Sequence, residues 1–221
     1  MSDSYINGHA RAIKTLIRFW HREKYIPEVP TFKMPKIAKK RLPVLTAEQV
    51  KQAIDKCSTI RDKAIVMLLV ETGLRRAELC ALNWGNIDIS SGIVRVAKGK
   101  GGKARAAVVG IKTRRVLIAY RRGILHEDKH PVFQISNGKR LSPNGLRSIL
   151  LRISERAGFH ITPHTLRRTF ATLSLRAGMN LIQLQAMMGH SSLEMTRKYI
   201  QMIDEDLIEA HKEHGPIDNI L

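Results

Sequence analysis

Two histidines, an arginine and a tyrosine lie within one stretch of the sequence, from Thr162 to Tyr199. Thr162 is a typical helix N-cap and is followed by proline, so His164 and Arg167 fall in the first turn of a helix, on one face. His190 directly follows a glycine suited to ending a helix. A tyrosine hydroxyl can attack a phosphate if positive charge surrounds it and a base takes its proton. These four residues together therefore point to phosphate chemistry.

Two basic residues upstream complete a set that could cut and rejoin a phosphodiester. Arg75 follows a glycine that is predicted to end a helix, which places it at a tight corner. A planar guanidinium can bind two non-bridging oxygens, so Arg75 and Arg167 suit a clamp on the phosphate. Lys100, on a predicted hairpin, could protonate the leaving 5′-oxygen. His164 could exchange a proton with the nucleophile, and His190 could donate to a phosphate oxygen.

Each of these residues also has an ordinary structural interpretation. Arg75 could be a surface arginine paired with Glu78. His190 could be a residue that merely follows a helix cap, and Tyr199 could be a half-buried aromatic. The argument for a site therefore rests on the set and not on any single member.

The sequence offers no convincing motif for a nucleotide or a metal ion. The run GKGGK lacks a Ser or Thr after Lys103 and the glycine spacing of a phosphate-binding Walker A loop. His126 and His130 are four residues apart, but Pro131 follows at once and no further ligands surround them. A magnesium-dependent nuclease would need clustered carboxylates, and the basic motifs contain none. We therefore expect no metal.

The composition points to a polyanionic partner. The 221 residues include 38 Lys and Arg but only 19 Asp and Glu, a formal net charge of +19, which favours nucleic-acid binding. Cys57 and Cys80 are too few for a disulfide framework or a zinc site and fit a reducing cytoplasm. No apolar run is long enough to span a bilayer, and the N-terminus lacks the apolar core of a signal peptide. We expect a soluble cytoplasmic protein that does not associate with a membrane.

The chain divides into three segments of different composition. Residues 1–26 contain one predicted amphipathic helix over 4–24, and residues 27–43 form a proline-containing basic linker. Residues 44–221 form the main domain, with an acidic C-terminal helix and a tail from about residue 203. Basic residues of the linker, of the hairpin and of one later loop are the candidate DNA contacts. They are Lys36, Lys39, Lys40, Arg41, Lys98, Lys103, Arg105, Lys139 and Arg140.

The main domain is predicted to be mainly α-helical with a small antiparallel β-hairpin, an α+β fold. Capping signals and apolar periodicity predict its helices from 46 onward and over 61–71, 74–79, 113–125 and 142–157, with two more from 162 and over 180–189. The hairpin pairs 93–96 with 106–109 around a basic tip. Residues 131–135 are a candidate for one further short strand.

Five motifs, in their order, resemble the catalytic domain of the tyrosine recombinases, the phage-integrase family. They are TGLRRAEL at 72–79, GKGGKAR at 99–105, HTLR at 164–167, MGH at 188–190 and the tyrosine of TRKYI. The resemblance covers about Leu45 to Ile200. Ala77 stands where the family often has serine, and three lysines crowd the hairpin. The family's catalytic positions match Arg75, Lys100, His164, Arg167, His190 and Tyr199.

The resemblance implies that Tyr199 attacks the scissile phosphate to give a 3′-phosphotyrosyl enzyme and a free 5′-hydroxyl. It implies no metal or nucleotide cofactor, because the phosphotyrosine keeps the bond energy. It also implies double-stranded DNA as the partner, a homotetramer on DNA and a monomer in free solution. The expected setting is the cytoplasm and nucleoid of a prokaryote, with a phage or mobile element as a further source.

The two ends of the chain raise separate expectations. By resemblance, the helix after Tyr199 packs in trans on a neighbouring protomer, although folding back in cis fits the sequence equally. The first helix resembles only the last part of the family's N-terminal core-binding domain. We therefore expect either an excised fragment or a naturally minimal enzyme.

Two other functions compete with a site-specific recombinase. A type IB topoisomerase shares the phosphotyrosine chemistry but relaxes supercoils as a monomer, and the predicted donated C-terminal helix argues against it. A DNA-binding accessory protein without catalysis would not need the six candidate residues together. The sequence therefore favours a recombinase that cuts and rejoins DNA.

Overall fold

The computed structural model describes residues 3–31, 34, 42–96, 104–124 and 126–189. The chain divides into two compact units, Met1–Arg41 and Leu42–Leu221. None of the helices within these described ranges is long and apolar enough to cross a membrane. Most of the predicted basic linker, the hairpin tip and every residue from His190 onward lie outside the described ranges.

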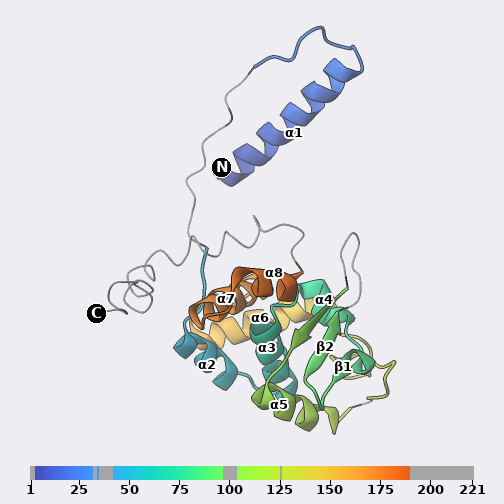
Figure 1. Ribbon diagram of the computed structural model, residues 1–221, viewed down its shortest axis with the longest axis vertical. Helices are drawn as coiled ribbons and strands as arrows, with labels where there is room; N and C mark the ends of the chain where they lie inside the picture. The colour runs from blue at the N-terminus through green and yellow to red at the C-terminus, as the bar shows by residue number, and fades with distance from the viewer. Residues whose placement is uncertain (1–2, 32–33, 35–41, 97–103, 125, 190–221) are drawn as a thin grey trace, which may run out of the picture. The chain divides into compact units, whose positions relative to one another are not determined.

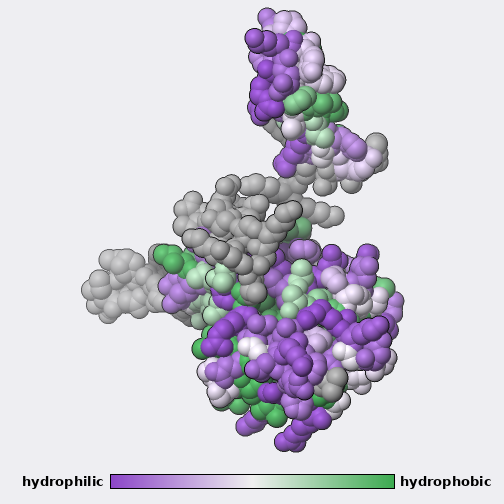
Figure 2. Space-filling model, turned by 90° about the vertical axis from the view of Figure 1, so that its right-hand side faces the viewer, coloured by the Kyte–Doolittle hydropathy of each residue, from purple (hydrophilic) through white to green (hydrophobic). Residues whose placement is uncertain are grey.

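The first unit contains helix α1, Asp3–Arg22 (Figure 1), which confirms the helix predicted over 4–24. Large apolar side chains of the predicted amphipathic stripe are exposed, with Ile6 at 42%, Ile13 at 52% and Trp20 at 41%. Figure 2 shows hydrophobic residues grouped on this unit beside hydrophilic ones. The helix ends where Lys24 takes a left-handed backbone conformation with φ 61°.

Helix α3, Ile60–Thr72, is the centre of the second unit. Its side chains from Ala64 to Leu69 include five that are completely buried, and it packs against α2, α5 and α7 (Figure 1). This burial on several sides explains why the stretch reads as an apolar run and not as an amphipathic stripe. The other helices in the described part of this unit are α2 Ala47–Asp55, α4 Arg76–Ala81, the 3₁₀ helix η1 Trp84–Asn86, α5 Ile111–Arg121, α6 Pro143–Ala157, α7 Pro163–Arg176 and α8 Leu181–Met188.

Three short antiparallel strands form the sheet, in the order β1 Ile87–Asp88, β2 Ile93–Val96 and β3 Arg105–Val108. The β2–β3 register pairs Val96 with Arg105 and Val94 with Ala107. The predicted hairpin and the mainly helical α+β class are therefore confirmed, with β1 as an additional strand. β1 was not predicted because two residues carry no recognisable alternation.

The short strand predicted at 131–135 was wrong. The segment makes only isolated bridges, Asn83 with Pro131 and Gln134 with Arg140. Pro131 has no N–H to give to a ladder, and the chain reverses at Gly138, whose φ is 76°. The apolar residues Val132 and Phe133 are buried in the core without a continuous strand partner.

Local signals fix the helix ends that matter for the site. Thr46 and Gln49 form the predicted capping box, and Thr162 accepts a hydrogen bond from the N–H of Thr165 at 3.0 Å. Gly73 and Gly189 end α3 and α8 in the left-handed conformation, with φ of 58° and 63°. These two caps and the start of α7 position the candidate catalytic residues.

Candidate active site

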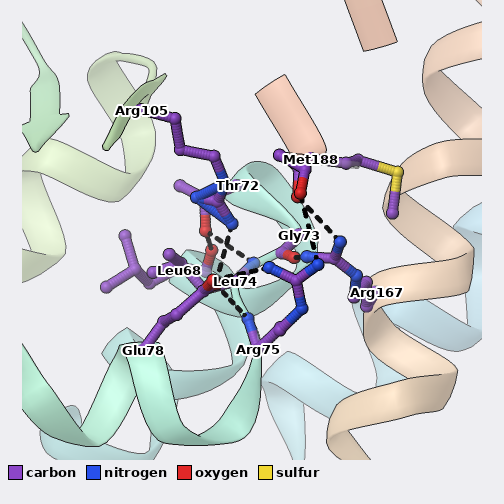
Figure 3. A network of polar contacts seen from close by, with 10 residues as sticks. Leu68, Thr72, Gly73, Leu74, Arg75, Glu78, Arg105, Arg167 and Met188 are labelled. Carbon is purple, nitrogen blue, oxygen red and sulfur yellow. Dashed lines mark hydrogen bonds and ion pairs between the residues drawn. The ribbon is translucent and has the colours of Figure 1, made fainter. Parts of the chain in front are cut away.

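The ends of α3 and α8 meet beside α7, and Arg167 joins them (Figure 3). The Arg167 residue is only 5% exposed. Its Nη1 donates to the carbonyl of Gly73, and its Nη2 donates to the carbonyl of Met188 at 2.8 Å. Since both carbonyls belong to the last turns of helices, the guanidinium also opposes the negative ends of two helix dipoles. Arg167 therefore fixes the turn that leads to Arg75 and the turn that leads to His190.

Arg75 lies at the N-cap of α4. Its side chain turns towards the place where the ends of α3 and α8 meet beside α7, which we call the junction. Its Nη1 pairs with Glu78 Oε1 at 2.8 Å, and its Nη2 donates to the carbonyl of Gly189 at 3.3 Å. The side chain is 44% exposed. The alternative of a surface pair with Glu78 is thus correct as geometry, but the same guanidinium also reaches the end of α8. Arg75 and Arg167, far apart in the sequence, meet consecutive carbonyls.

Glu78 is a central member of this junction that sequence reasoning treated only as a surface partner. Its Oε2 accepts from the backbone N–H of Arg75 at 2.7 Å and from Arg105 Nη2 at 2.8 Å. Burial disfavours the charged form of Glu78, but these hydrogen bonds and the charges of Arg105 and Arg75 outweigh burial, so its pKa lies below its ordinary value. Glu78 therefore stays ionised and holds two arginines.

Arg105 was predicted as a DNA contact, yet its side chain is only 7% exposed and pairs with Glu78. The strand alternation contained the missed signal, because Ala107 and Val109 are buried and share the parity of Arg105. Burial lowers the pKa of the Arg105 guanidinium, Glu78 raises it, and the neighbouring Arg75 lowers it further. At neutral pH the group remains charged.

His164 lies in the first turn of α7, as predicted, and its side chain is exposed. Arg167, three residues further along the same helix, is buried instead. The start of α7 therefore holds one exposed and one buried candidate residue. The exposed imidazole is open to a group that approaches from solvent.

Three predicted catalytic residues, Lys100, His190 and Tyr199, lie outside the described ranges. The same holds for a set of predicted DNA contacts, Lys36, Lys39, Lys40, Arg41, Lys98 and Lys103. The described neighbours still locate two attachment points. His190 follows Gly189 directly, and Lys100 belongs to the connection between Val96 and Arg105.

The other two predicted DNA contacts lie in the loop before α6, and both are exposed. Lys139 points to solvent at the turn around Gly138. Arg140 uses its guanidinium within the protein, donating to the carbonyls of Cys80 at 2.9 Å and Leu82 at 3.1 Å. It therefore anchors this loop to the end of α4, whatever further contact it makes.

In the described ranges, no group of three or more His, Cys, Asp and Glu residues gathers where a metal ion could bind. His126 and His130 are used locally: Nδ1 of His126 lies 2.9 Å from the carbonyl of Ile124, and Nδ1 of His130 accepts from the N–H of Glu127 at 3.1 Å. Both oxygens of the junction carboxylate, Glu78, are occupied by arginine donors.

The junction is suited to an anion that carries oxygen atoms. Two guanidinium groups share the single carboxylate of Glu78, and Arg167 adds a third positive charge, so positive charge exceeds negative charge among these residues. Planar guanidinium groups in a partly buried place bind phosphate oxygens more strongly than the same groups in water. The exposed part of Arg75 is the face that such an anion can reach.

The chain is similar to known proteins over most of its length. The profile of the phage integrase family matches residues 43–205. The tyrosine recombinase XerA of Saccharolobus solfataricus is 34% identical over 174 residues, which cover 79% of this chain and 57% of that protein. XerA of Pyrococcus furiosus is 33% identical over 222 residues, covering 98% and 76%. The chain thus spans between about half and three quarters of the length of these relatives.

Solved structures show the same fold. The crystal structure of XerA recombinase has a TM-score of 0.72 and 30% identity, covering 81% of this chain and 67% of that chain. XerH recombinase in a post-cleavage complex with palindromic difH substrate has a TM-score of 0.77 and 23% identity, covering 96% and 67%. A Tn1549 transposon integrase in complex with a circular intermediate DNA has a TM-score of 0.77 and 21% identity, covering 90% and 75%.

Proposed function

Because the chain belongs to the phage integrase family, we propose that it is a site-specific tyrosine recombinase that cuts and rejoins DNA through a 3′-phosphotyrosyl intermediate. The observation that carries the proposal is the meeting of Arg75 and Arg167 on the consecutive carbonyls of Met188 and Gly189. This places two guanidinium groups beside the point where the chain continues to His190.

In this proposal the two arginines supply most of the electrostatic stabilisation of the transition state. Attack on a phosphodiester builds negative charge on the non-bridging oxygens, and donors fixed before the reaction stabilise that charge without reorganising. Loss of one such donor in other enzymes slows the reaction by roughly 100- to 1,000-fold. Arg167 is fixed by burial and Arg75 by Glu78, so both are held in place before the substrate binds.

Four further residues complete the reaction in this proposal. Tyr199 attacks phosphorus through its hydroxyl oxygen, and the bond from phosphorus to the 5′-oxygen breaks. His164, exposed at the start of α7, takes the tyrosine proton and returns it in the reverse step. Lys100, between the two paired strands, protonates the leaving 5′-oxygen. His190 donates a hydrogen bond to a phosphate oxygen.

Double-stranded DNA is the proposed substrate. The formal net charge of +19 supports it, and the structural neighbours include recombinases solved on DNA sites. We infer a tetramer on DNA with pairwise exchange of strands, and the nucleoid as the place of action. The predicted basic contacts, including Lys139, would hold the phosphate backbone and account for salt-dependent binding.

A nicked suicide substrate tests the proposal. Duplexes selected from a random pool by binding are synthesised with a nick next to each phosphate in turn, so that cleavage releases a short fragment and traps the covalent complex. The wild-type protein should form an adduct resistant to denaturation, and Tyr199→Phe should form none. Binding without an adduct at any nick position would favour an accessory DNA-binding protein. Relaxation of supercoiled DNA without exchange between two sites would favour a type IB topoisomerase.

A further inference from the structure

Arg105 faces inward from its strand, which is unusual for a charged residue. It pairs with Val96 in the β2–β3 register and has the same parity as the buried Ala107. The face it shares with Ala107 meets α3 and α8. An inward charge lowers stability unless it has partners, so its presence calls for a physical reason.

The partner of Arg105 is Glu78, and exposure increases stepwise from this pair to the site. The side chains of Arg105, Glu78 and Arg75 are 7%, 16% and 44% exposed. One carboxylate oxygen of Glu78 binds Arg105, and the other binds the guanidinium of Arg75 (Figure 3). The three residues therefore form a line from the interior of the sheet to the exposed clamp arginine.

Arg105 also lies directly against the end of α8. A Cβ added to Gly189 would be 2.6 Å from Arg105 Cδ and 2.7 Å from Arg105 Nε. Any residue other than glycine at position 189 would therefore clash with Arg105 unless one of the two moved. The Arg105 side chain thus contacts two of the segments that supply candidate catalytic residues, α4 through Glu78 and the turn before His190 through Gly189.

We propose that Arg105 is a positioning residue of the active site, which fixes Glu78, and through it the guanidinium of Arg75, against the end of α8. The proposal rests on the recombinase function proposed above and adds a residue to it. Arg105 is the first residue of β3, at the base of the hairpin on which Lys100 is predicted. Its contact with Glu78 therefore also connects the base of this hairpin to Arg75.

Stability alone is a weak explanation for this pair. A buried ion pair is often no more stabilising than apolar side chains of the same volume, because desolvation offsets the attraction. Arg105 in addition leaves Nε and Nη1 buried without a hydrogen-bond partner within the described ranges. A charged side chain at position 105 can orient Arg75 through Glu78, whereas an apolar side chain cannot.

The experiment compares adduct formation by Arg105→Gln and the wild type on two nicked substrates. One carries the natural scissile phosphate, and the other a methylphosphonate, in which a methyl group replaces one non-bridging oxygen and removes its charge. The adduct rate on phosphate should fall about 100-fold, as expected for a catalytic group displaced by about 1 Å. The rate on methylphosphonate should fall much less, because this substrate develops less charge for Arg75 to neutralise. Arg105→Lys, which keeps the charge next to Glu78, should recover part of the loss.

Arg114→Gln is the matched control. Arg114 is also partly buried, donates to the carbonyls of Ile89 and Ser90 and has a buried Nε without a partner in the described ranges, but it lies at the start of α5, away from the junction. It should lower stability with little effect on the adduct rate. Equal losses for Arg105→Gln on both substrates, or a wild-type rate on phosphate, would overturn the positioning role.

A measurement without activity separates this inference from the proposed function. The Nε–Hε signal of Arg75 in the NMR spectrum of the whole chain, assigned with Arg75→Lys, should report a restrained side chain in the wild type. In Arg105→Gln it should shift and sharpen as the guanidinium becomes free to rotate. An unchanged Arg75 signal would refute the inference even if the wild type forms adducts, whereas a changed signal in a protein that forms no adduct would refute only the recombinase function.

Discussion

The turn at Gly189 gives a quantitative test of how the site is held. Gly189→Ala adds one methyl group to a residue whose φ is 63° and whose side chain would meet Arg105 at 2.6 Å. Gly158→Ala is the matched control, because Gly158 also ends a helix in the left-handed conformation, with φ of 77°, but a Cβ there meets nothing within 4 Å. The difference between the two variants isolates the contact with Arg105.

The magnitude follows from two contributions. The left-handed conformation with a Cβ lowers the free energy of unfolding by about 1–2 kcal/mol in both variants. Forcing a methyl group against a packed, ion-paired side chain lowers it by about 1–3 kcal/mol more, in Gly189→Ala alone. Gly158→Ala should thus be destabilised by about 1–2 kcal/mol and Gly189→Ala by about 2–5 kcal/mol.

Urea unfolding of the two variants, each also made in an Arg105→Ala background, completes a double-mutant cycle. Removal of the Arg105 side chain should reduce the destabilisation by Gly189→Ala to that of Gly158→Ala and leave the latter unchanged. Equal destabilisation of the two glycine variants in the wild-type background, or a Gly189→Ala effect that persists without Arg105, would refute the packing argument.

Three further predictions concern the residues around this turn. Gly73→Ala should lower the free energy of unfolding by about 2–5 kcal/mol, since its Cβ would lie 2.4 Å from the Phe170 ring at a φ of 58°; a loss no larger than that of Gly158→Ala would contradict this. Arg167→Lys replaces the two guanidinium nitrogens that reach the carbonyls of Gly73 and Met188 with a single nitrogen, so unfolding in urea should show a loss of about 1–3 kcal/mol and the adduct assay a loss of about 100-fold or more; wild-type adduct rates would show that the planar fork is unnecessary. Glu78 has a folded-state pKa below its ordinary value of 4.5, so the stability it contributes is complete above that pH and disappears as the pH falls through the folded pKa. The stability difference between the wild type and Glu78→Gln should therefore shrink as urea titrations move from pH 6 to pH 3, and a difference independent of pH would mean that the charge of Glu78 is not what stabilises the junction.

Much of the fold could be predicted because its signals are local. The pair Thr46 and Gln49, the sequence Thr162-Pro163 and the glycines at 73, 158 and 189 determine where helices begin and end through hydrogen bonds and backbone conformations of a few residues. The hairpin could be predicted in the same way, from its two apolar runs and the basic residues between them. Arg75, His164 and Arg167 could be selected because the family motifs are themselves anchored at such helix ends.

What only the tertiary structure decided is which of these ends come together and which charges turn inward. The sequence alone determined the mainly helical class, the positions of the caps and a set of candidate catalytic residues. It did not reveal that Arg167 is buried between two carbonyls while His164 is exposed, or that Arg105 belongs to the interior with Glu78 and not to the basic surface. These outcomes depend on the end of α8 lying near the end of α3, where Arg167 donates to the carbonyls of both Gly73 and Met188. Arg75 and Gly189, which meet there, are more than a hundred positions apart along the chain. The sequence specifies the charge of each side chain. Its burial and its partners, which determine the strength of its interactions, depend on which distant segments the core brings together.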